Sequence, residues 1–353
     1  MKKRILALTL TFALALPLAA CGGSGSKDPA PEGTGSAGEK TVTLRMASVV
    51  ANSELEERKT GMAAGLMTWI DTVEAESGGT IQIDLYPDSQ LASGTDAIVN
   101  GIQTGAFEVA HFTTGNWASY SDAFAELNVP YLYTNYDEVH SVLEGEIGQA
   151  MKDQLEQDVS GVKPLAYISI GFRNVTASKP IQTVADMKGL KIRTMDDALQ
   201  IAAMEAMGCT VTSVPISELY SALQTKMVDA QENPLSTIYS NKFFEVNPYA
   251  CLTRHSYTST FVFMNADVYN GLSDTQKAAI DRANEAATAA SKTAAESAEA
   301  EYQEMLEAEG MTIYAPTDEE MADFQEAASS CWTKAEEIMG SERYDALMAA
   351  MGK

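Results

Sequence analysis

Short apolar runs with the alternating pattern of β-strands recur along this chain of 353 residues. Most are separated by longer segments with helical spacing of apolar residues, at 62–77, 95–105, 137–155 and 198–207. The expected strands are 41–48, 81–86, 107–112, 165–170, 190–194, 209–214, 227–231, 249–253 and 260–265. This alternation of strands and helices predicts an α/β fold with a largely parallel sheet.

One segment near the C-terminus predicts an unusually long helix. Ser273 and Gln276 form a capping-box start, and no helix breaker follows before Gly310. At 1.5 Å per residue, such a helix would be about 55 Å long. Because this length exceeds one small lobe and alanine is abundant, we expect the helix to lie across two lobes. Two shorter helices with an unmarked break are the alternative.

Residues 1–40 have the pattern of an export leader followed by a tether. Three basic residues precede an apolar run that ends at residue 20, which predicts a signal peptide over 1–20. The run closes with the sequence LAAC, which resembles a bacterial lipobox, so Cys21 is expected to become the lipidated N-terminus. Ordinary cleavage with an incidental Cys21 is the alternative. Gly, Ser, Pro and Thr dominate residues 21–40, which predicts a flexible tether.

The charge of the chain excludes one class of partner. The sequence has 49 acidic and 24 basic residues, a formal charge of −25. A surface this acidic repels phosphate backbones, so we expect no binding to nucleic acid. Residues 41–353 are numerous enough to form two domains.

Three cysteines follow the tether: Cys209, Cys251 and Cys331. An odd number outside the cell leaves at least one free thiol or an intermolecular bond. Cys209 and Cys251 flank expected strands and could form a disulfide, which would stabilise the fold by about 4 kcal/mol. Three buried thiols are the other possibility.

Conventional catalytic signatures are missing from the sequence. His111, His140 and His255 have no metal-ligand spacing, and there is no nucleophile elbow, P-loop or dinucleotide fingerprint. We therefore expect no metal site, no cofactor and no enzymatic activity.

Two arginines are the best candidates for contacting a ligand. Arg193 ends an expected strand, and ligands of open α/β sheets bind beyond the carboxyl ends of strands. Arg173 also follows an expected strand. A guanidinium offers a planar fork that matches a carboxylate. The alternatives are a structural pair of Arg193 with Asp196 or Asp197, and a plain surface charge for Arg173.

Asn233 is a third candidate. The sequence over 217–245 predicts a helix, a short strand, a turn at Asn233-Pro234 and another helix. Pro234 disfavours a helical conformation at Asn233. The amide of Asn233 is thus expected at a strand end, free to contact a ligand, although most Asn-Pro turns are only turns.

Several short motifs together resemble one known family, the solute-binding proteins of tripartite ATP-independent periplasmic (TRAP) transporters, of the dicarboxylate-binding (DctP) kind. The resemblance covers nearly all of residues 41–353. The motifs are YPDSQL at 86–91, VPYL at 129–132, GFRNVT at 171–176, DMKGLKIR at 186–193, SELYSALQ at 217–224, DAQENP at 229–234 and KFFEV at 242–246. Their order and spacing make the match specific.

The resemblance implies a two-lobed, periplasmic-binding-protein-like α/β fold with a long helix bridging both lobes. Lobe I would comprise 41–170 plus 259–298, and lobe II 171–258 plus 299–353. The ligand would be an organic acid, either a sugar acid or a dicarboxylate. The expected partner is a TRAP membrane permease, and the expected location is extracytoplasmic, anchored by lipid to the cell membrane.

The resemblance also assigns roles to single residues. Arg193 would clamp the ligand carboxylate, and Arg173 and Asn233 would make further contacts. Thr114 and Tyr257 are additional candidates. All five are expected to lie in the cleft between the lobes.

The sequence departs from the family pattern at several positions. Ala230 stands where glycine is common, and Ile216 replaces a frequent aromatic residue. The loops 49–53 and 112–116 are less typical, and they would contact the far end of the ligand. The identity of the acid therefore stays open.

Three alternative functions remain compatible with these patterns: an ABC-type receptor, a sensory lipoprotein and, less favoured, a secreted enzyme acting on acidic sugars. A single unbroken helix across both lobes would favour the TRAP type over the ABC type.

Overall fold

Nine strands form one mixed sheet in the computed structural model, which describes residues 40–353. The expected signal peptide 1–20, the expected lipidation at Cys21 and nearly all of the expected tether lie outside the described residues. The strands are β1 (Val42–Ser48), β2 (Ile81–Tyr86), β3 (Val109–Thr113), β4 (Val162–Ala177), β5 (Lys191–Thr194), β6 (Thr210–Ser213), β7 (Ala230–Asn233), β8 (Tyr249–Asn265) and β9 (Thr312–Tyr314). Their order is β2-β1-β3-β8-β4-β7-β5-β6, and β9 pairs with β8.

Helices connect most of the strands. They are α1 (Asn52–Glu57), α2 (Gly61–Glu76), α3 (Thr95–Thr104), α4 (Tyr136–Leu143), α5 (Glu146–Asp158), α6 (Val184–Met187), α7 (Ala198–Ala206), α8 (Ile216–Gln224), α9 (Leu235–Ser240), α10 (Ala266–Gly271), α11 (Asp274–Ala308), α12 (Asp318–Ala328), α13 (Cys331–Met339) and α14 (Ser341–Ala350), with 3₁₀ turns η1 (Thr114–Ser119), η2 (Ala125–Asn128) and η3 (Phe243–Glu245). The helix expected over 137–155 is two helices, because the backbone at Gly145 is extended.

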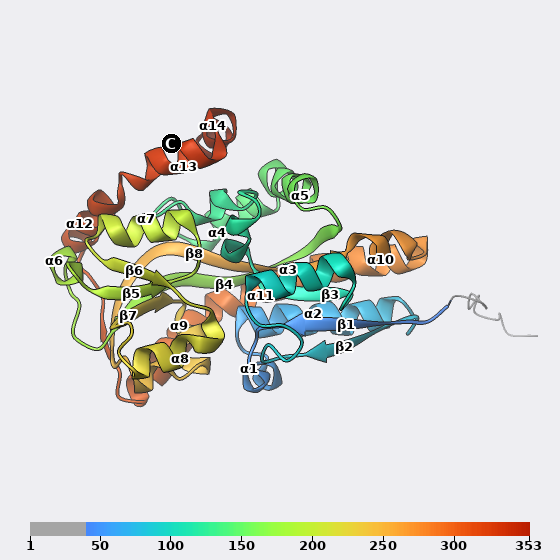
Figure 1. Ribbon diagram of the computed structural model, residues 1–353, viewed down its shortest axis with the longest axis horizontal. Helices are drawn as coiled ribbons and strands as arrows, with labels where there is room; N and C mark the ends of the chain where they lie inside the picture. The colour runs from blue at the N-terminus through green and yellow to red at the C-terminus, as the bar shows by residue number, and fades with distance from the viewer. Residues whose placement is uncertain (1–39) are drawn as a thin grey trace, which may run out of the picture. The chain divides into compact units, whose positions relative to one another are not determined.

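Two long strands, β4 and β8, run through both halves of the sheet (Figure 1). They pair with each other in antiparallel orientation, with register shifts between Ser169 and Gly171 and between Arg173 and Val175. The pairs β3–β8 and β4–β7 are also antiparallel, whereas β1–β2, β1–β3, β5–β6 and β5–β7 are parallel. The expectation of a largely parallel sheet is therefore wrong at its centre, because the two crossing strands run in opposite directions.

The sheet has separate cores on the two sides of the crossing strands. We call the part built on β1–β3 the first lobe and the part built on β5–β7 the second lobe. Leu44, Trp69 and Val109 are buried together in the first lobe, and Ile192 and Met204 in the second. This arrangement gives the two-lobed fold that the motifs implied.

Helix α11 is one unbroken helix of 35 residues, which begins with the expected capping box at Ser273. Ile280 and Ala287 pack into the core of the first lobe. Ala298 and Leu306 pack into a core of the second lobe. The expected bridging helix is thus confirmed, and it ties the lobes together along its whole length.

The C-terminal helices also contact the first lobe. Ala335 and Leu347 share a core with Phe124. Arg343, on α14, donates hydrogen bonds to the carboxylates of Asp122 and Glu126. The chain therefore crosses from the second lobe back to the first before it reaches residue 353.

The three cysteines of the described part of the chain, Cys209, Cys251 and Cys331, are free buried thiols. A disulfide between Cys209 and Cys251 is therefore not formed, and the second of the two possibilities holds. Burial raises the pKa of both Cys209 and Cys251 to about 12, which keeps them protonated and unreactive.

Helix α2 approaches α11 and β4 closely because two of its residues have no side chain. A Cβ atom on Gly61 would lie 2.4 Å from the carbonyl oxygen of Ser169 and 2.7 Å from Cβ of Ala295. A Cβ atom on Gly65 would lie 2.8 Å from Cβ of Ser291. The seam between the crossing strand and the bridging helix thus depends on these glycines.

We expect Gly61→Ala to lower the free energy of unfolding by about 1–3 kcal/mol, because the added methyl group meets backbone atoms that cannot rotate away. Gly271→Ala is the matched control, since a Cβ there meets nothing within 4 Å. The control should be neutral or stabilising by up to about 1 kcal/mol. Chemical denaturation measures both, and equal stability of the two variants would contradict the close packing of α2.

Candidate functional site

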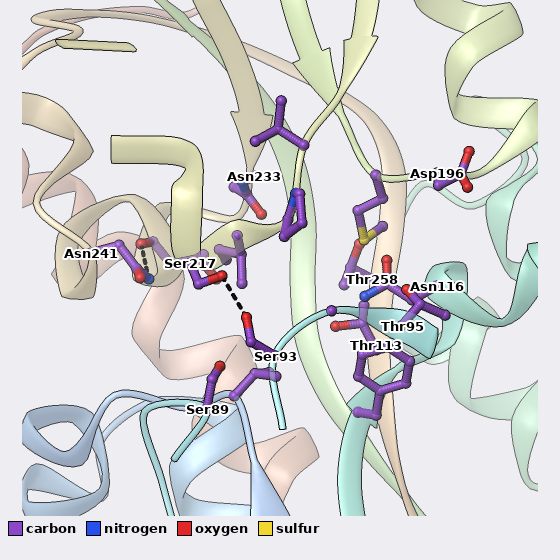
Figure 2. A pocket seen from close by; sticks show the side chains of 18 of the residues that line it. Ser89, Ser93, Thr95, Thr113, Asn116, Asp196, Ser217, Asn233, Asn241 and Thr258 are labelled. Atoms are coloured by element: carbon purple, nitrogen blue, oxygen red, sulfur yellow. Dashed lines mark hydrogen bonds between the residues drawn. The ribbon is translucent and has the colours of Figure 1, made fainter. Parts of the chain in front are cut away.

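A cavity of about 490 Å³ lies where the two lobes face each other. The first lobe contributes residues from 49–54, 89–97 and 112–119, and the second lobe from 193–196 and 213–241. Most of these residues lie at strand ends or helix starts, which is where an α/β sheet exposes polar groups. Figure 2 shows polar side chains that reach the cavity from both sides.

Arg193 lies in β5, lines the cavity and is only 3% exposed. Its Nε donates to the carbonyl oxygen of Val214 at 2.7 Å. Within residues 40–353, Nη1 and Nη2 donate to no protein atom and the side chain forms no ion pair. Burial lowers its pKa to about 10, with Glu232 opposing the shift, so the group stays charged at neutral pH.

The two aspartates that follow Arg193 have other partners. Asp196 accepts a hydrogen bond from Oγ of Ser119 at 2.9 Å. Asp197 caps α7 by accepting from the backbone N–H groups of Leu199 and Gln200. The alternative of a structural pair between Arg193 and these aspartates is therefore wrong.

Arg173 is also buried, but its charge is balanced inside the protein. Its guanidinium pairs with the carboxylate of Glu232, with Nη2 at 2.9 Å from Oε1. Nη1 donates to Oγ1 of Thr258 at 2.9 Å, and Nη2 also donates to Oδ1 of Asn233 at 3.1 Å. Arg173 is no surface charge, because β4 continues beyond residue 170 and carries it into the sheet.

Glu232 and His255 were missed by sequence reasoning, although both support the site. Glu232 is fully buried, and Nε2 of His255 lies 3.1 Å from its Oε2. Burial opposes ionisation of Glu232, but Arg173 and His255 outweigh it and lower its pKa to about 2. The one sequence signal for Glu232 was its position next to Asn233. His255 had no such signal, because it lies in β8, 23 residues further along the chain.

Asn233 ends β7 as expected, and Pro234 with its extended backbone begins the turn to α9. Its amide is not free. Oδ1 accepts from Arg173, and Nδ2 donates to Oε1 of Gln231 at 2.5 Å. The side chain still lines the cavity, so one lone pair and one N–H remain for a ligand.

Thr114 and Tyr257 do not line this cavity. Oγ1 of Thr114 donates to the carbonyl oxygen of Ser259 at 3.1 Å, and Thr114 borders a separate cavity of about 150 Å³. The hydroxyl of Tyr257 contacts Tyr167 inside the core. Their neighbours Thr113 and Thr258 line the main cavity instead. Tyr257 and Thr258 are adjacent in β8 and face opposite sides of it, so an error of one position moves the side chain out of the site. Thr114 lies one residue beyond the end of β3, in the 3₁₀ turn η1.

The lobes touch across the cavity through groups that the sequence did not mark. Oγ of Ser93, in the first lobe, lies 3.0 Å from Oγ of Ser217, which lies in the first turn of α8 in the second lobe (Figure 2). The bond between Ser119 and Asp196 also joins the lobes. These contacts bound the cavity on two sides.

Glu54 is a buried carboxyl group in the cavity lining. Oγ1 of Thr60 donates to its Oε1 at 2.5 Å, and its Oε2 has no partner among the described residues. Burial raises the pKa of Glu54 to about 7. Glu54 therefore keeps its proton to a higher pH than an exposed glutamate does.

The raised pKa predicts how stability depends on pH. Glu54 favours the folded state most below about pH 4.5, its unfolded value, and this contribution is lost as the pH rises to about 7. We expect the stability of the wild type relative to Glu54→Gln to fall by roughly 2–4 kcal/mol over that range. Urea denaturation at a series of pH values measures this difference.

Glu56→Gln is the control, because Glu56 is exposed on the same helix and is not among the groups that shift the pKa of Glu54. It should follow the wild type at every pH. Parallel curves for the wild type and Glu54→Gln would show that Glu54 is not buried in solution.

Comparison with known proteins places this architecture in a family. The model of the family described as bacterial extracellular solute-binding protein, family 7 (DctP), matches residues 52–338. The chain belongs to this family. Its members are solute-binding proteins, and the fold is that of solved TRAP periplasmic solute-binding proteins.

Two curated relatives and one solved structure illustrate the match. The 2,3-diketo-L-gulonate-binding periplasmic protein YiaO of Escherichia coli is 36% identical over 228 residues, which cover 64% of this chain and 69% of YiaO. The C4-dicarboxylate-binding periplasmic protein DctP of Rhodobacter capsulatus is 28% identical over 304 residues, 86% of this chain and 90% of DctP. A TRAP solute-binding protein from Polaromonas bound to D-erythronate has a TM-score of 0.80, with 27% identity, 88% of this chain covered and 99% of that chain.

Proposed function

We propose that this protein is an extracytoplasmic receptor that captures a carboxylate-bearing small molecule in its cleft and delivers it to a TRAP-type membrane permease. The observation that carries this proposal is Arg193, a buried guanidinium that lines the cavity and whose two terminal nitrogens have no protein partner among residues 40–353. A buried cation without a partner is costly, and a carboxylate matches its two parallel donors.

The names of the relatives support an organic acid as ligand. YiaO is named for 2,3-diketo-L-gulonate, DctP for C4-dicarboxylates, and the Polaromonas structure holds D-erythronate. All three ligands carry a carboxylate. Arg193 would be the main anchor in this chain, with Arg173 and Asn233 as further contacts.

Capture would proceed by closure of the lobes about the crossing strands. In this proposal, lobe I comprises 41–170 plus 259–298, and lobe II comprises 171–258 plus 299–353. The separate cores of the two lobes support this division. Two side-chain hydrogen bonds join the lobes across the cavity, and α13 and α14 share a core with residues of both lobes. The closed form would present the ligand to the permease.

The proposed activity is binding without chemical conversion, and it requires no cofactor. Among residues 40–353, no helix has the length and apolar character needed to cross a membrane. We propose that lipid on Cys21 anchors the receptor to the outer face of the cell membrane. The lipobox-like sequence before Cys21 is the support for that part of the proposal.

We expect Arg193→Ala to weaken binding of the acid by roughly 2–5 kcal/mol, because the ligand carboxylate would be buried without its partner. Arg193→Lys should also weaken binding, since a single ammonium replaces the fork. Native mass spectrometry of the purified protein identifies a captured acid, and calorimetry with that acid measures the change.

Arg282→Ala is the matched control, because Arg282 forms an exposed ion pair with Glu76 outside the cavity. It should bind as the wild type does. Wild-type affinity in a folded Arg193→Ala protein would reject the proposed role of Arg193.

A further inference from the structure

The charges around the cavity are unevenly matched. Within the described part of the chain, the charged residues of the cavity lining are Glu54, Asp96, Arg173, Arg193 and Asp196. No lysine or histidine is among these lining residues. The lining therefore offers two cations at most, both of them arginines.

Only one of these arginines is available to a ligand carboxylate. Arg173 is already neutralised by Glu232, which is fully buried and ionised. Its bonds to Thr258 and Asn233 use further N–H groups. Arg193, by contrast, uses only Nε within the protein. The cavity can thus neutralise one carboxylate with a guanidinium fork.

The other charged groups of the lining are acidic and come from both lobes. Asp96, in the first turn of α3, accepts a hydrogen bond from the hydroxyl of Tyr120 at 2.6 Å. Asp196 accepts one from Ser119. In the described residues, neither aspartate forms an ion pair with a cation. A second carboxylate on the ligand would lie near these aspartates, and no cation of the lining would remain to pair with it.

The remaining polar lining is neutral and rich in hydroxyl and amide groups (Figure 2). These side chains both donate and accept, so they match ligand hydroxyl groups, which do the same. They are Ser89, Ser93, Thr95, Thr113, Asn116, Ser213, Ser217, Thr237 and Asn241.

Helix starts also face the cavity and could favour an anion. Residues of the first turns of α3 and α8 line it, and neither helix has a side-chain cap. However, Asp96 and Glu218 occupy those first turns and already provide the negative charge that a helix start favours. The free N–H groups can equally donate to hydroxyl oxygens.

We propose that this cavity selects a monocarboxylate with a hydroxylated chain, of the sugar-acid class, and rejects the same chain when it ends in a second carboxylate. Arg193 binds the one acid group, the hydroxyl and amide lining binds the chain, and Asp96 and Asp196 repel a second charge. This inference rests on the proposed function and narrows it to one ligand class.

Matched pairs of acids test this selection directly. Gluconate and glucarate, galactonate and galactarate, and erythronate and meso-tartrate differ within each pair only in whether the last carbon is an alcohol or an acid. Thermal-shift screening and calorimetry should find a pair whose monocarboxylate binds at least about tenfold more tightly. Hexanoate, which lacks hydroxyl groups, should bind more weakly than gluconate.

The double variant Asp96→Asn and Asp196→Asn tests the cause of the selection. Asparagine keeps the oxygen that accepts from Tyr120 and Ser119 but removes the negative charge. The ratio of the two affinities should move toward one, mainly because the dicarboxylate binds better. Asp153→Asn, on the exposed face of α5 and outside the lining, is the matched control and should leave the ratio unchanged.

The failures of the two proposals are distinguishable. If the dicarboxylates bind as tightly as their partners, or only unhydroxylated acids bind, the selection is wrong. In that case, if Arg193→Ala abolishes binding of the acids that the wild type does bind, the proposed receptor function still stands and only the proposed selectivity is rejected. If no carboxylate binds at all, both proposals fail. An unchanged ratio in the double aspartate variant would overturn the role of Asp96 and Asp196.

Discussion

The site depends on a contrast between two buried arginines. Burying a guanidinium requires an anion to balance it, because the interior of a protein solvates charge poorly. Arg173 has that anion within the protein, in Glu232. Arg193 has instead a cavity and one carbonyl oxygen, and within residues 40–353 it forms no ion pair. In the proposed function, the carboxylate of the ligand supplies the anion that Arg193 lacks.

Strands of the sheet and the bridging helix fix the positions of the two arginines. β5 carries Arg193, β7 ends with Asn233 and the crossing strand β4 carries Arg173, and all three residues line the cavity. Helix α11 packs against both lobes without a break, which limits how they can move apart. The acidic surface does not oppose an anion strongly at such a site, because salt screens charges beyond about 8 Å. The negative overall charge of the chain is therefore compatible with an unpaired positive charge on Arg193 in the cavity lining.

Sequence reasoning succeeded where chemistry is local. The strand-end positions of Arg193 and Asn233 followed from short periodic runs and from Pro234. It failed where the answer depended on the other side of a strand or on a distant partner. Thr258, and not Tyr257, faces the cavity, and β4 runs past Arg173 and buries it. Glu232 and His255 had no motif of their own, yet they decide which of the two arginines has its charge balanced within the protein.

By itself, the sequence determined the alternation of elements, the start of the long helix at Ser273 and the family motifs, because these depend on neighbours along the chain. Only the tertiary structure decided the antiparallel pairing of β4 with β8, the free state of the three thiols and the charge left on Arg193. Each of these depends on groups that are distant in sequence. Their pairing is set by which residues the folded sheet brings together, and no local pattern encodes it.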